Sequence, residues 1–292
     1  MDDHLLHIRH RTEYRYAFPV RFGTHRLVMR PREGHDLRVE SHQLSVSPEA
    51  SVTWTRDIFG NSVAWARMEG ESTTLEVISE VVVRRFFDPS SPPTFDHSPS
   101  AYPPEYDGIE QGVAAAYLAP VFPEETQALQ GWLTSLPKPT DFPSIEAFVV
   151  RLTECIKDAV KYQRRESKGV QSPGSTLALG SGSCRDSATL MMETLRHLGI
   201  AARFASGYLD CPATRAARGS THAWTEVYFP HLGWRGFDPT TGRVCDHRHI
   251  VTGTSHHPRG VMPLSGRYSG PANAFLSMSV GVEFSSPETS IA

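Results

Sequence analysis

The chain has 292 residues, a length that favours two modest hydrophobic cores over one large one. Hydrophobic residues make up 39% and charged residues 21% of it, which is typical of a packed globular protein and excludes a disordered or fibrous one. The formal net charge is -3 and charges of both signs are interspersed, so no basic surface for nucleic acid or an anionic membrane is predicted.

The N-terminal segment and the cysteines predict a cytoplasmic protein. After Met1 the chain soon alternates polar with apolar residues, without the basic start and apolar run of a signal peptide. The most apolar window, residues 112–122, contains Pro120 and is shorter than the roughly 20 residues that a bilayer span needs. The four cysteines are scattered, with no C-x-x-C pair, so we expect a reducing compartment.

Residues 1–87 predict an all-β domain. From Leu6 to Tyr16 the even positions are mostly apolar and the odd ones charged, the period of a half-buried strand. Further strands are expected over 26–29, 43–46, 52–58, 62–68 and 75–83, with a hairpin turn at 59–61. Prolines crowd residues 88–106, which therefore predict a linker.

Residues 107–285 predict an α+β domain, followed by a frayed tail at 286–292. Apolar residues recur at helical spacing over 145–160 after Ser144, a predicted N-cap. A second helix is expected from Cys184 to Leu198, ended by Gly199. Strands are expected over 202–209, 222–229, 234–238 and 276–284.

Cys184 is the first candidate for chemistry. It follows a glycine-rich segment, 180–183, and begins the second predicted helix, where free N–H groups and the helix dipole favour an anion. In such surroundings a thiol pKa of about 8.5 can fall to roughly 3.5 to 7.5, and the thiolate is the nucleophilic form. The same N–H groups can receive an oxyanion. A buried structural cysteine is the competing interpretation, which Cys184 alone does not exclude.

His222 and Asp238 are the second and third candidates. His222 shares a strand face with Trp224, and Asp238 ends the next strand before Pro239. Taken singly, a strand histidine is more often structural and such an acid more often caps a turn. A turn at 230–233 can bring the two side by side on adjacent strands, where the Asp would hold the imidazole tautomer. Cysteine, histidine and aspartate together form a nucleophile, a base and an orienting acid.

Three motifs resemble the transglutaminase-like superfamily, specifically its bacterial cysteine-protease-like branch. They are Gly-Ser-Gly-Ser-Cys-Arg-Asp-Ser-Ala at 180–188, Thr-His-Ala-Trp-Thr-Glu-Val-Tyr at 221–228 and Gly-Trp-Arg-Gly-Phe-Asp-Pro-Thr at 233–240. Segments 169–173 and 198–209 also look like that branch, so the resemblance covers nearly the whole chain. It implies a papain-like α+β core, in which the cysteine helix packs on an antiparallel sheet, behind an N-terminal β-sandwich-like domain.

The same resemblance implies a catalytic triad of Cys184, His222 and Asp238. Ser187 stands where relatives often have an aromatic residue, a departure that affects the pocket and not the triad. The implied reaction is attack on a peptide or isopeptide amide to form a thioester, which water or a primary amine then resolves; we expect hydrolysis, with transamidation as the alternative. The partner is then a peptide or protein substrate, without a cofactor, and the oligomeric state is not indicated. A non-catalytic protein-binding module of the same fold is the competing class.

Supporting residues are predicted around the triad. Gln171 is a candidate side-chain donor to the oxyanion, as amides are in papain-like enzymes. Trp224 and Tyr208 are candidates to line the acyl site, although aromatic residues on strands usually belong to the core. Arg185 and Asp186 are expected to pair across the first helical turn.

A metal site is the remaining alternative. Cysteine and histidine, the usual zinc ligands, cluster at the end of the catalytic half as Cys245, His247, His249, His256 and His257. Their spacing matches no zinc pattern, and 14 histidines make chance clustering common. A solvated loop without metal is therefore expected there.

Overall fold

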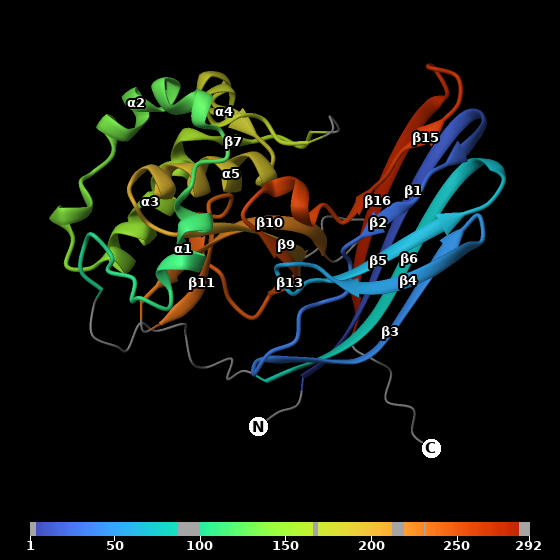
Figure 1. Ribbon diagram of the computed structural model, residues 1–292, viewed down its shortest axis with the longest axis horizontal. Coiled ribbons are helices and arrows are strands. Elements are labelled where there is room, and N and C mark those ends of the chain that lie inside the picture. Colours follow the sequence, from blue (N-terminus) through green and yellow to red (C-terminus); the bar gives the residue numbers. More distant parts are fainter. Residues whose placement is uncertain (1–3, 87–99, 166–168, 212–218, 231, 286–292) are drawn as a thin grey trace.

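The computed structural model describes residues 4–86, 100–165, 169–211, 219–230 and 232–285, and it has a β-sandwich beside an α+β unit (Figure 1). The predicted α+β class with an N-terminal β region is confirmed. The linker expected over 88–106 falls largely on residues 87–99, which lie outside the described residues.

The sandwich consists of two antiparallel sheets. The first contains β3 (Leu37–Ser47), β6 (Glu71–Arg85), β1 (His4–Phe22), β15 (Tyr268–Ser269) and β16 (Phe275–Ser285). The second has the order β14 (Leu264–Ser265), β2 (His25–Leu27), β5 (Ser62–Met68) and β4 (Ala50–Arg56). The hairpin expected at 59–61 is present, because Arg56 pairs with Ser62 and Gly60 has a φ of 76°. Apolar side chains such as Val20 and Leu27 form the core between the sheets.

The last strand corrects one expectation. The strand predicted over 276–284 exists as β16, but it pairs with β1, for example Ile8 with Phe284, and not with strands of the catalytic half. Strands β14 and β15 likewise join sandwich strands. Assigning this segment to the catalytic unit was therefore wrong. Its alternating pattern specifies a strand with one buried face but does not specify the partner strand.

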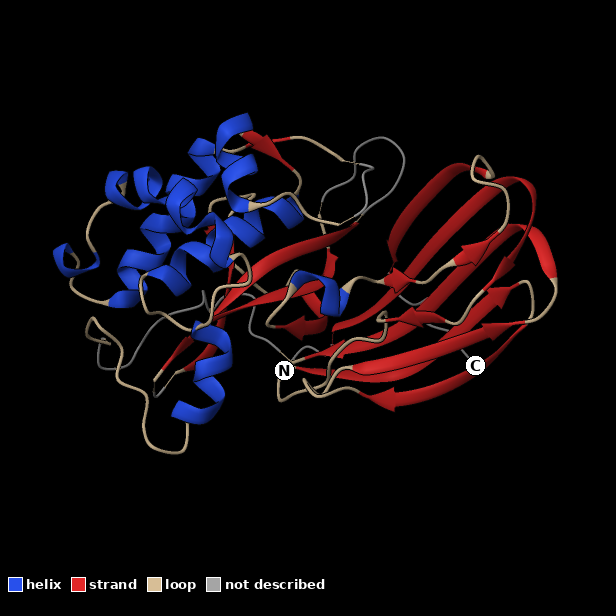
Figure 2. Ribbon diagram, turned by 45° about the horizontal axis from the view of Figure 1, so that its top comes forward, coloured by secondary structure: helices blue, strands red, loops and turns tan. Residues whose placement is uncertain are grey.

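The α+β unit is built on a third antiparallel sheet, against which helices pack. The sheet order is β12 (Arg243–Val244), β11 (Gly233–Asp238), β10 (Ser220–Phe229), β9 (Ala202–Leu209) and β13 (His249–Ser255). The helices are α1 (Gln111–Leu118), α2 (Thr126–Ser135), α3 (Ile145–Ala159), α4 (Pro173–Leu179) and α5 (Cys184–His197). They gather on the side away from the sandwich (Figure 2). The short parallel pair β7 (Lys161–Tyr162) and β8 (Ser181–Gly182) leads into α5.

The capping residues predicted from the sequence lie at the ends of the two predicted helices. The Ser144 hydroxyl accepts from the Ala147 N–H at 3.2 Å and begins α3. Helix α5 starts with a capping box between Ser183 and Asp186, and Gly199, just beyond its end, has a φ of 71°. Helices α1, α2 and α4 were not predicted; each is short and carries a weaker apolar pattern than α3.

The two units share a small core. Tyr208 of β9 and Ile250 of β13 pack with residues of the first sandwich sheet, among them Leu6, Ile8 and Phe284. The Tyr208 hydroxyl also donates to the Met29 carbonyl at 3.1 Å. The sandwich therefore packs against the α+β unit through β9 and β13.

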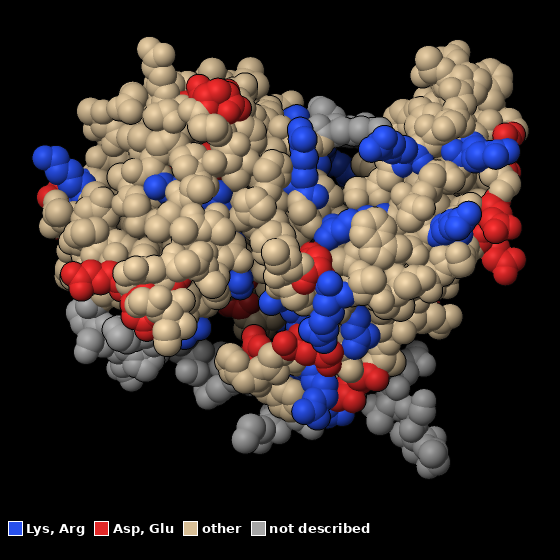
Figure 3. Space-filling model, in the orientation of Figure 1, with Lys and Arg blue, Asp and Glu red and all other residues tan. Residues whose placement is uncertain are grey.

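The visible surface mixes charges of both signs (Figure 3). On the first sandwich sheet, oppositely charged side chains pair across strands, as Arg9 does with Glu80 at 3.0 Å and Arg84 with Glu40 at 2.6 Å. Within the described part of the chain, no helix is long and apolar enough to cross a bilayer.

Candidate active site

A network of hydrogen bonds holds Cys184 at the first position of α5. The carboxylate of Asp186, fully buried, accepts from the Ser183 N–H at 2.8 Å, the Gln171 N–H at 2.7 Å and the Arg165 guanidinium at 2.7 and 2.8 Å. Asp186 thus pairs with Arg165, and the expected pair with Arg185 is not formed. This buried ion pair fixes the turn that presents the thiol.

Strand β10 brings His222 to that helix. The Thr225 hydroxyl donates to the Ala188 carbonyl at 2.9 Å, which ties β10 to the first turns of α5. Gly207 of β9 lies opposite His222 in the register. A Cβ at Gly207 would lie 2.0 Å from the Ile250 carbonyl oxygen and 2.9 Å from the Trp224 ring, so only glycine permits this packing.

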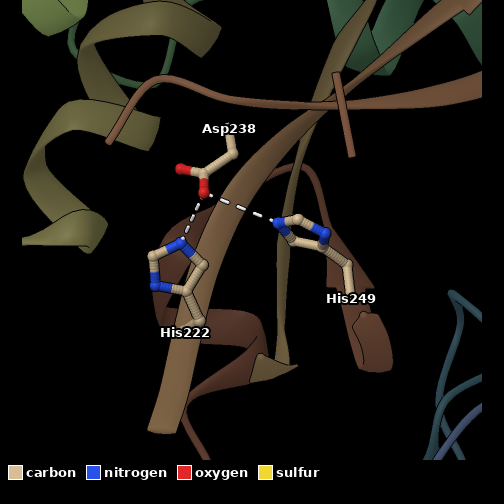
Figure 4. A group of neighbouring side chains, drawn as sticks. All are labelled: His222, Asp238 and His249. Carbon is tan, nitrogen blue, oxygen red and sulfur yellow. Dashed lines mark hydrogen bonds and ion pairs between the residues drawn. The ribbon is translucent and has the colours of Figure 1, made fainter. Parts of the chain in front are cut away.

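Asp238, at the end of β11, holds the imidazole (Figure 4). His222 Nε2 lies 2.9 Å from Asp238 Oδ2. The same oxygen accepts from the Thr241 hydroxyl at 3.0 Å, and Asp238 Oδ1 accepts from the Thr240 N–H at 2.9 Å. The pairing of β10 with β11 therefore brings His222 and Asp238 side by side, as the sequence predicts.

The charges in this cluster stabilise one another. Burial alone lowers the pKa of His222, but its hydrogen bonds to Asp238 and to the Cys184 thiol outweigh burial and raise that pKa to about 10. Burial raises the pKa of Asp238, whereas the hydrogen bond from His222 and the nearby His249 ring oppose it and hold the pKa well below its usual range. The arrangement is a buried carboxylate beside a cationic imidazole, which the thiol of Cys184 also contacts.

Two of the predicted supporting residues pack beside the cluster. Trp224 is 1% exposed, and its ring stacks on His222 with centroids 6.3 Å apart, so it supports the imidazole from inside the core. The Gln171 amide donates to the Ser181 carbonyl at 3.0 Å and contacts the Thr176 hydroxyl at 3.5 Å, so it braces the turn before Cys184.

Tyr208 is not brought into the site. In the β9–β10 register it pairs with Thr221, while His222 pairs with Gly207, so the Tyr208 and His222 side chains point to opposite faces of the sheet. Tyr208 is 2% exposed and lies in the core shared with the sandwich. The expectation that it lines the acyl site is therefore wrong.

His249 is the site residue that the sequence analysis missed. It begins β13, with a side chain only 6% exposed, and its Nε2 lies 3.5 Å from Asp238 Oδ2. The solvated loop expected around it is wrong, because β13 pairs with β9 and buries this end of the segment. The apolar run that starts at Ile250 was a signal for this strand.

In the part of the chain that the structure describes, the cysteine and histidines of the alternative zinc site do not come together as one set. Within the described residues, three metal-binding side chains come together as His222, Asp238 and His249, with donor atoms within 4.8 Å of one another. Only His249 belongs to the set considered from the sequence. Cys245 is instead packed beneath Gly236, and burial raises the pKa of its thiol.

A cysteine at a helix start, facing a histidine and an aspartate on an antiparallel sheet, defines a transglutaminase-like protein. Family comparisons agree with this fold and site. The bacterial transglutaminase-like N-terminal region matches residues 6–84, and the transglutaminase-like superfamily matches residues 136–239. The second match contains Cys184, His222 and Asp238 and ends before His249.

Related proteins match over nearly the full length. Uncharacterized proteins of Mycobacterium tuberculosis and Mycobacterium bovis are each 30% identical to the chain over 297 residues, covering 96% of this chain and 92% of the relative. A solved structure from Cytophaga hutchinsonii, described as a candidate cysteine protease, has a TM-score of 0.71 over 97% of this chain and 91% of that chain; at 18% identity it shows the fold. The chain belongs to the bacterial transglutaminase-like family.

Proposed function

We propose that this protein is an enzyme that cleaves peptide or isopeptide amide bonds through a thioester on Cys184, with water as the acceptor. The observation that carries the proposal is the surroundings of His222. Its Nε2 lies 2.9 Å from Asp238 Oδ2, and the Cys184 thiol is close enough to help raise the pKa of the same ring. The description of the Cytophaga relative as a candidate cysteine protease supports the same class of reaction.

The proposed first step forms the thioester. The Cys184 thiolate attacks the amide carbonyl carbon, a C–S bond forms, and the carbonyl oxygen becomes an oxyanion. The first N–H groups of α5, those of Cys184 and Arg185, point out of the helix start and can receive that oxyanion. The C–N bond then breaks, and His222 gives its proton to the leaving amine.

The proposed second step releases the acid. Neutral His222 takes a proton from water, which attacks the thioester carbonyl; the C–S bond breaks and the thiolate and imidazolium return. Because Nε2 is engaged by Asp238, Nδ1 is the nitrogen that exchanges these protons. Asp238 orients the ring and stabilises its charged form. Gln171 braces the turn before Cys184 through the Ser181 carbonyl, and a direct contact of its amide with the oxyanion stays a prediction.

The test is the pH dependence of alkylation by iodoacetamide, with the modified cysteine identified by peptide mass spectrometry. At about pH 6.5 Cys184 should be alkylated much faster than the other three cysteines, and His222→Ala should slow that reaction. Cys155 and Cys245 are internal controls, because burial raises the pKa of each thiol. If all four cysteines react equally slowly, the enzyme proposal fails and a binding module of this fold replaces it.

The acceptor is tested separately. Peptide substrates incubated with and without a primary amine should give the same carboxylic acid product by mass spectrometry, because water resolves the thioester. A product that contains the added amine would replace hydrolysis with transamidation while keeping the thioester on Cys184. The cytoplasmic location expected from the sequence stays a prediction.

A further inference from the structure

Two imidazoles converge on one oxygen of Asp238 (Figure 4). We infer that His249 is a positioning residue, which holds the Asp238 carboxylate so that it faces His222. The inference rests on the proposed function, since the readout is the reactivity of Cys184. His249 lies outside the segment matched to the superfamily core, residues 136–239, and comes from a different strand than either partner.

The backbone sets the tautomer of His249. The Asp246 N–H donates to His249 Nδ1 at 3.2 Å, so in the neutral ring the proton lies on Nε2. That nitrogen lies 3.5 Å from Asp238 Oδ2. In the cationic ring Nε2 is also protonated, and the second proton faces Asp246 Oδ1 at 3.4 Å. In either state a protonated Nε2 therefore faces Asp238 at ion-pair distance, longer than an ordinary hydrogen bond.

The position of the His249 ring is fixed by packing. Its centroid lies 5.2 Å from that of Trp224 in an edge contact, while Trp224 stacks on His222 with centroids 6.3 Å apart. The buried Trp224 indole thus contacts both imidazoles, whose ring centroids are 6.1 Å apart, and fixes their separation. The turn from Asp246 to His249, closed by a 2.9 Å backbone bond, holds the ring from the other side.

Asp238 needs such donors because it is a carboxylate with no exposed surface. Water cannot solvate it, so its charge is stabilised by His222, His249, Thr241 and the Thr240 N–H. Removing His249 would take one donor from Oδ2, the oxygen that His222 uses. The Asp238 carboxylate could then rotate or take up a proton. In either case the His222 imidazolium would lose part of the negative charge that stabilises it.

A metal held by the same three side chains is the competing explanation. To bind a metal, each of the two histidines would need its coordinating nitrogen unprotonated. Here Asp238 raises the pKa of each ring after the opposing effect of burial, which favours protons at these positions. Both Nε2 atoms also approach Asp238 Oδ2 itself, His222 at 2.9 Å in a hydrogen bond and His249 at 3.5 Å in an ion-pair contact, as protonated nitrogens beside a carboxylate do.

The experiment compares three variants by the pH profile of Cys184 alkylation. His249→Leu removes the donor and keeps comparable bulk, His249→Gln keeps an amide donor, and His247→Leu is the control from the same turn, where the residue is exposed. The Leu variant should lose about tenfold of the Cys184 alkylation rate near pH 6.5, the effect expected for losing a polar partner of a buried carboxylate, whereas the Gln variant should stay within about threefold of the wild type. The control should match the wild type.

The outcomes separate the two claims. A wild-type Cys184 that reacts slowly contradicts the proposed function. A fast wild type with an equally fast His249→Leu contradicts the positioning role alone, and so does a Gln variant as slow as Leu. Should the Leu variant not fold, His249→Asn, too short to reach Asp238, replaces it. If the pH profile of Cys184 alkylation in the wild type shifts after EDTA treatment and returns when zinc is added, the inference is overturned in favour of a metal site.

Discussion

His10 in the sandwich and His222 in the catalytic unit are both buried, yet their charges are set in opposite directions. Among the described residues, the His10 ring nitrogens bond to the hydroxyls of Tyr208 and Thr12, at 3.1 and 3.0 Å, and burial lowers the pKa of His10 to about 4. Burial also disfavours a charged His222, but Asp238 and Cys184 raise its pKa to about 10. Burial alone therefore does not decide the charge of a histidine; the partners do.

The ion pairs of the two units also differ, because one pair is buried and the other is exposed. In the catalytic unit Glu193 and Arg196 are fully buried on α5 with 3.7 Å between them. On the sandwich, Arg9 and Glu80 are 36% and 39% exposed at 3.0 Å. We expect charge removal to be costly in the first region and nearly neutral in the second.

Asp238→Asn should have the largest effect. An amide cannot balance the imidazolium and favours the wrong tautomer, so activity on a peptide substrate should fall by about 10⁴-fold. His10→Gln, which changes the other buried histidine, should leave the rate at neutral pH within about threefold. Equal losses of activity in Asp238→Asn and His10→Gln would show that packing, and not the charge of the partner, distinguishes the two buried histidines.

Glu193→Gln should destabilise the fold by about 3 to 5 kcal/mol, because it leaves Arg196 buried without its anion. The Glu193 carboxylate also accepts from the Val121 and Phe122 N–H groups, at 3.0 to 3.1 Å, and ties that loop to α5. Urea unfolding followed by circular dichroism measures the change. A loss below about 1 kcal/mol, as at an exposed pair, would contradict the expected difference between the regions.

His10 should make the protein less stable in acid. Its folded pKa of about 4 lies below the unfolded value of 6.5, so only the unfolded state binds the proton between these values. Stability is then lost as pH falls from about 6.5 toward 4, by up to about 3 kcal/mol from this group. In His10→Gln the free energy of unfolding should fall less steeply over that window.

His222 should act with the opposite sign. Its folded pKa is raised to about 10, so its contribution is complete below the unfolded value and is lost as pH rises through about 10. His222→Gln should therefore flatten the alkaline limb of the stability curve and leave the acid limb unchanged. A variant that flattens the acid limb instead would reverse the assignment of the two histidines.

Arg9→Gln should have the smallest effect, within about 1 kcal/mol, because water and salt screen the exposed partner Glu80. The difference from wild type should shrink further in about 1 M salt, where the Debye length is about 3 Å. A loss as large as that of Glu193→Gln would remove the distinction between buried and surface pairs.

Local patterns in the sequence determined much of the fold and the core of the site. Caps and apolar spacing place α3 and α5 within a residue or two, because Ser144 and Gly199 act on backbone groups of their own helix. The β9, β10 and β11 strands follow from local alternation and turns. Cys184, His222 and Asp238 are recognisable from motifs, since each lies in a distinctive local sequence.

Only the tertiary structure decided which elements meet. Alternation made β16 a strand, but pairing with β1 brings together residues about as far apart as the chain allows. Register turned Tyr208 away from His222, because neighbouring strand positions face opposite sides. His249 reaches Asp238 only because β13 pairs with β9. These contacts depend on the packing of distant segments, which no local pattern contains.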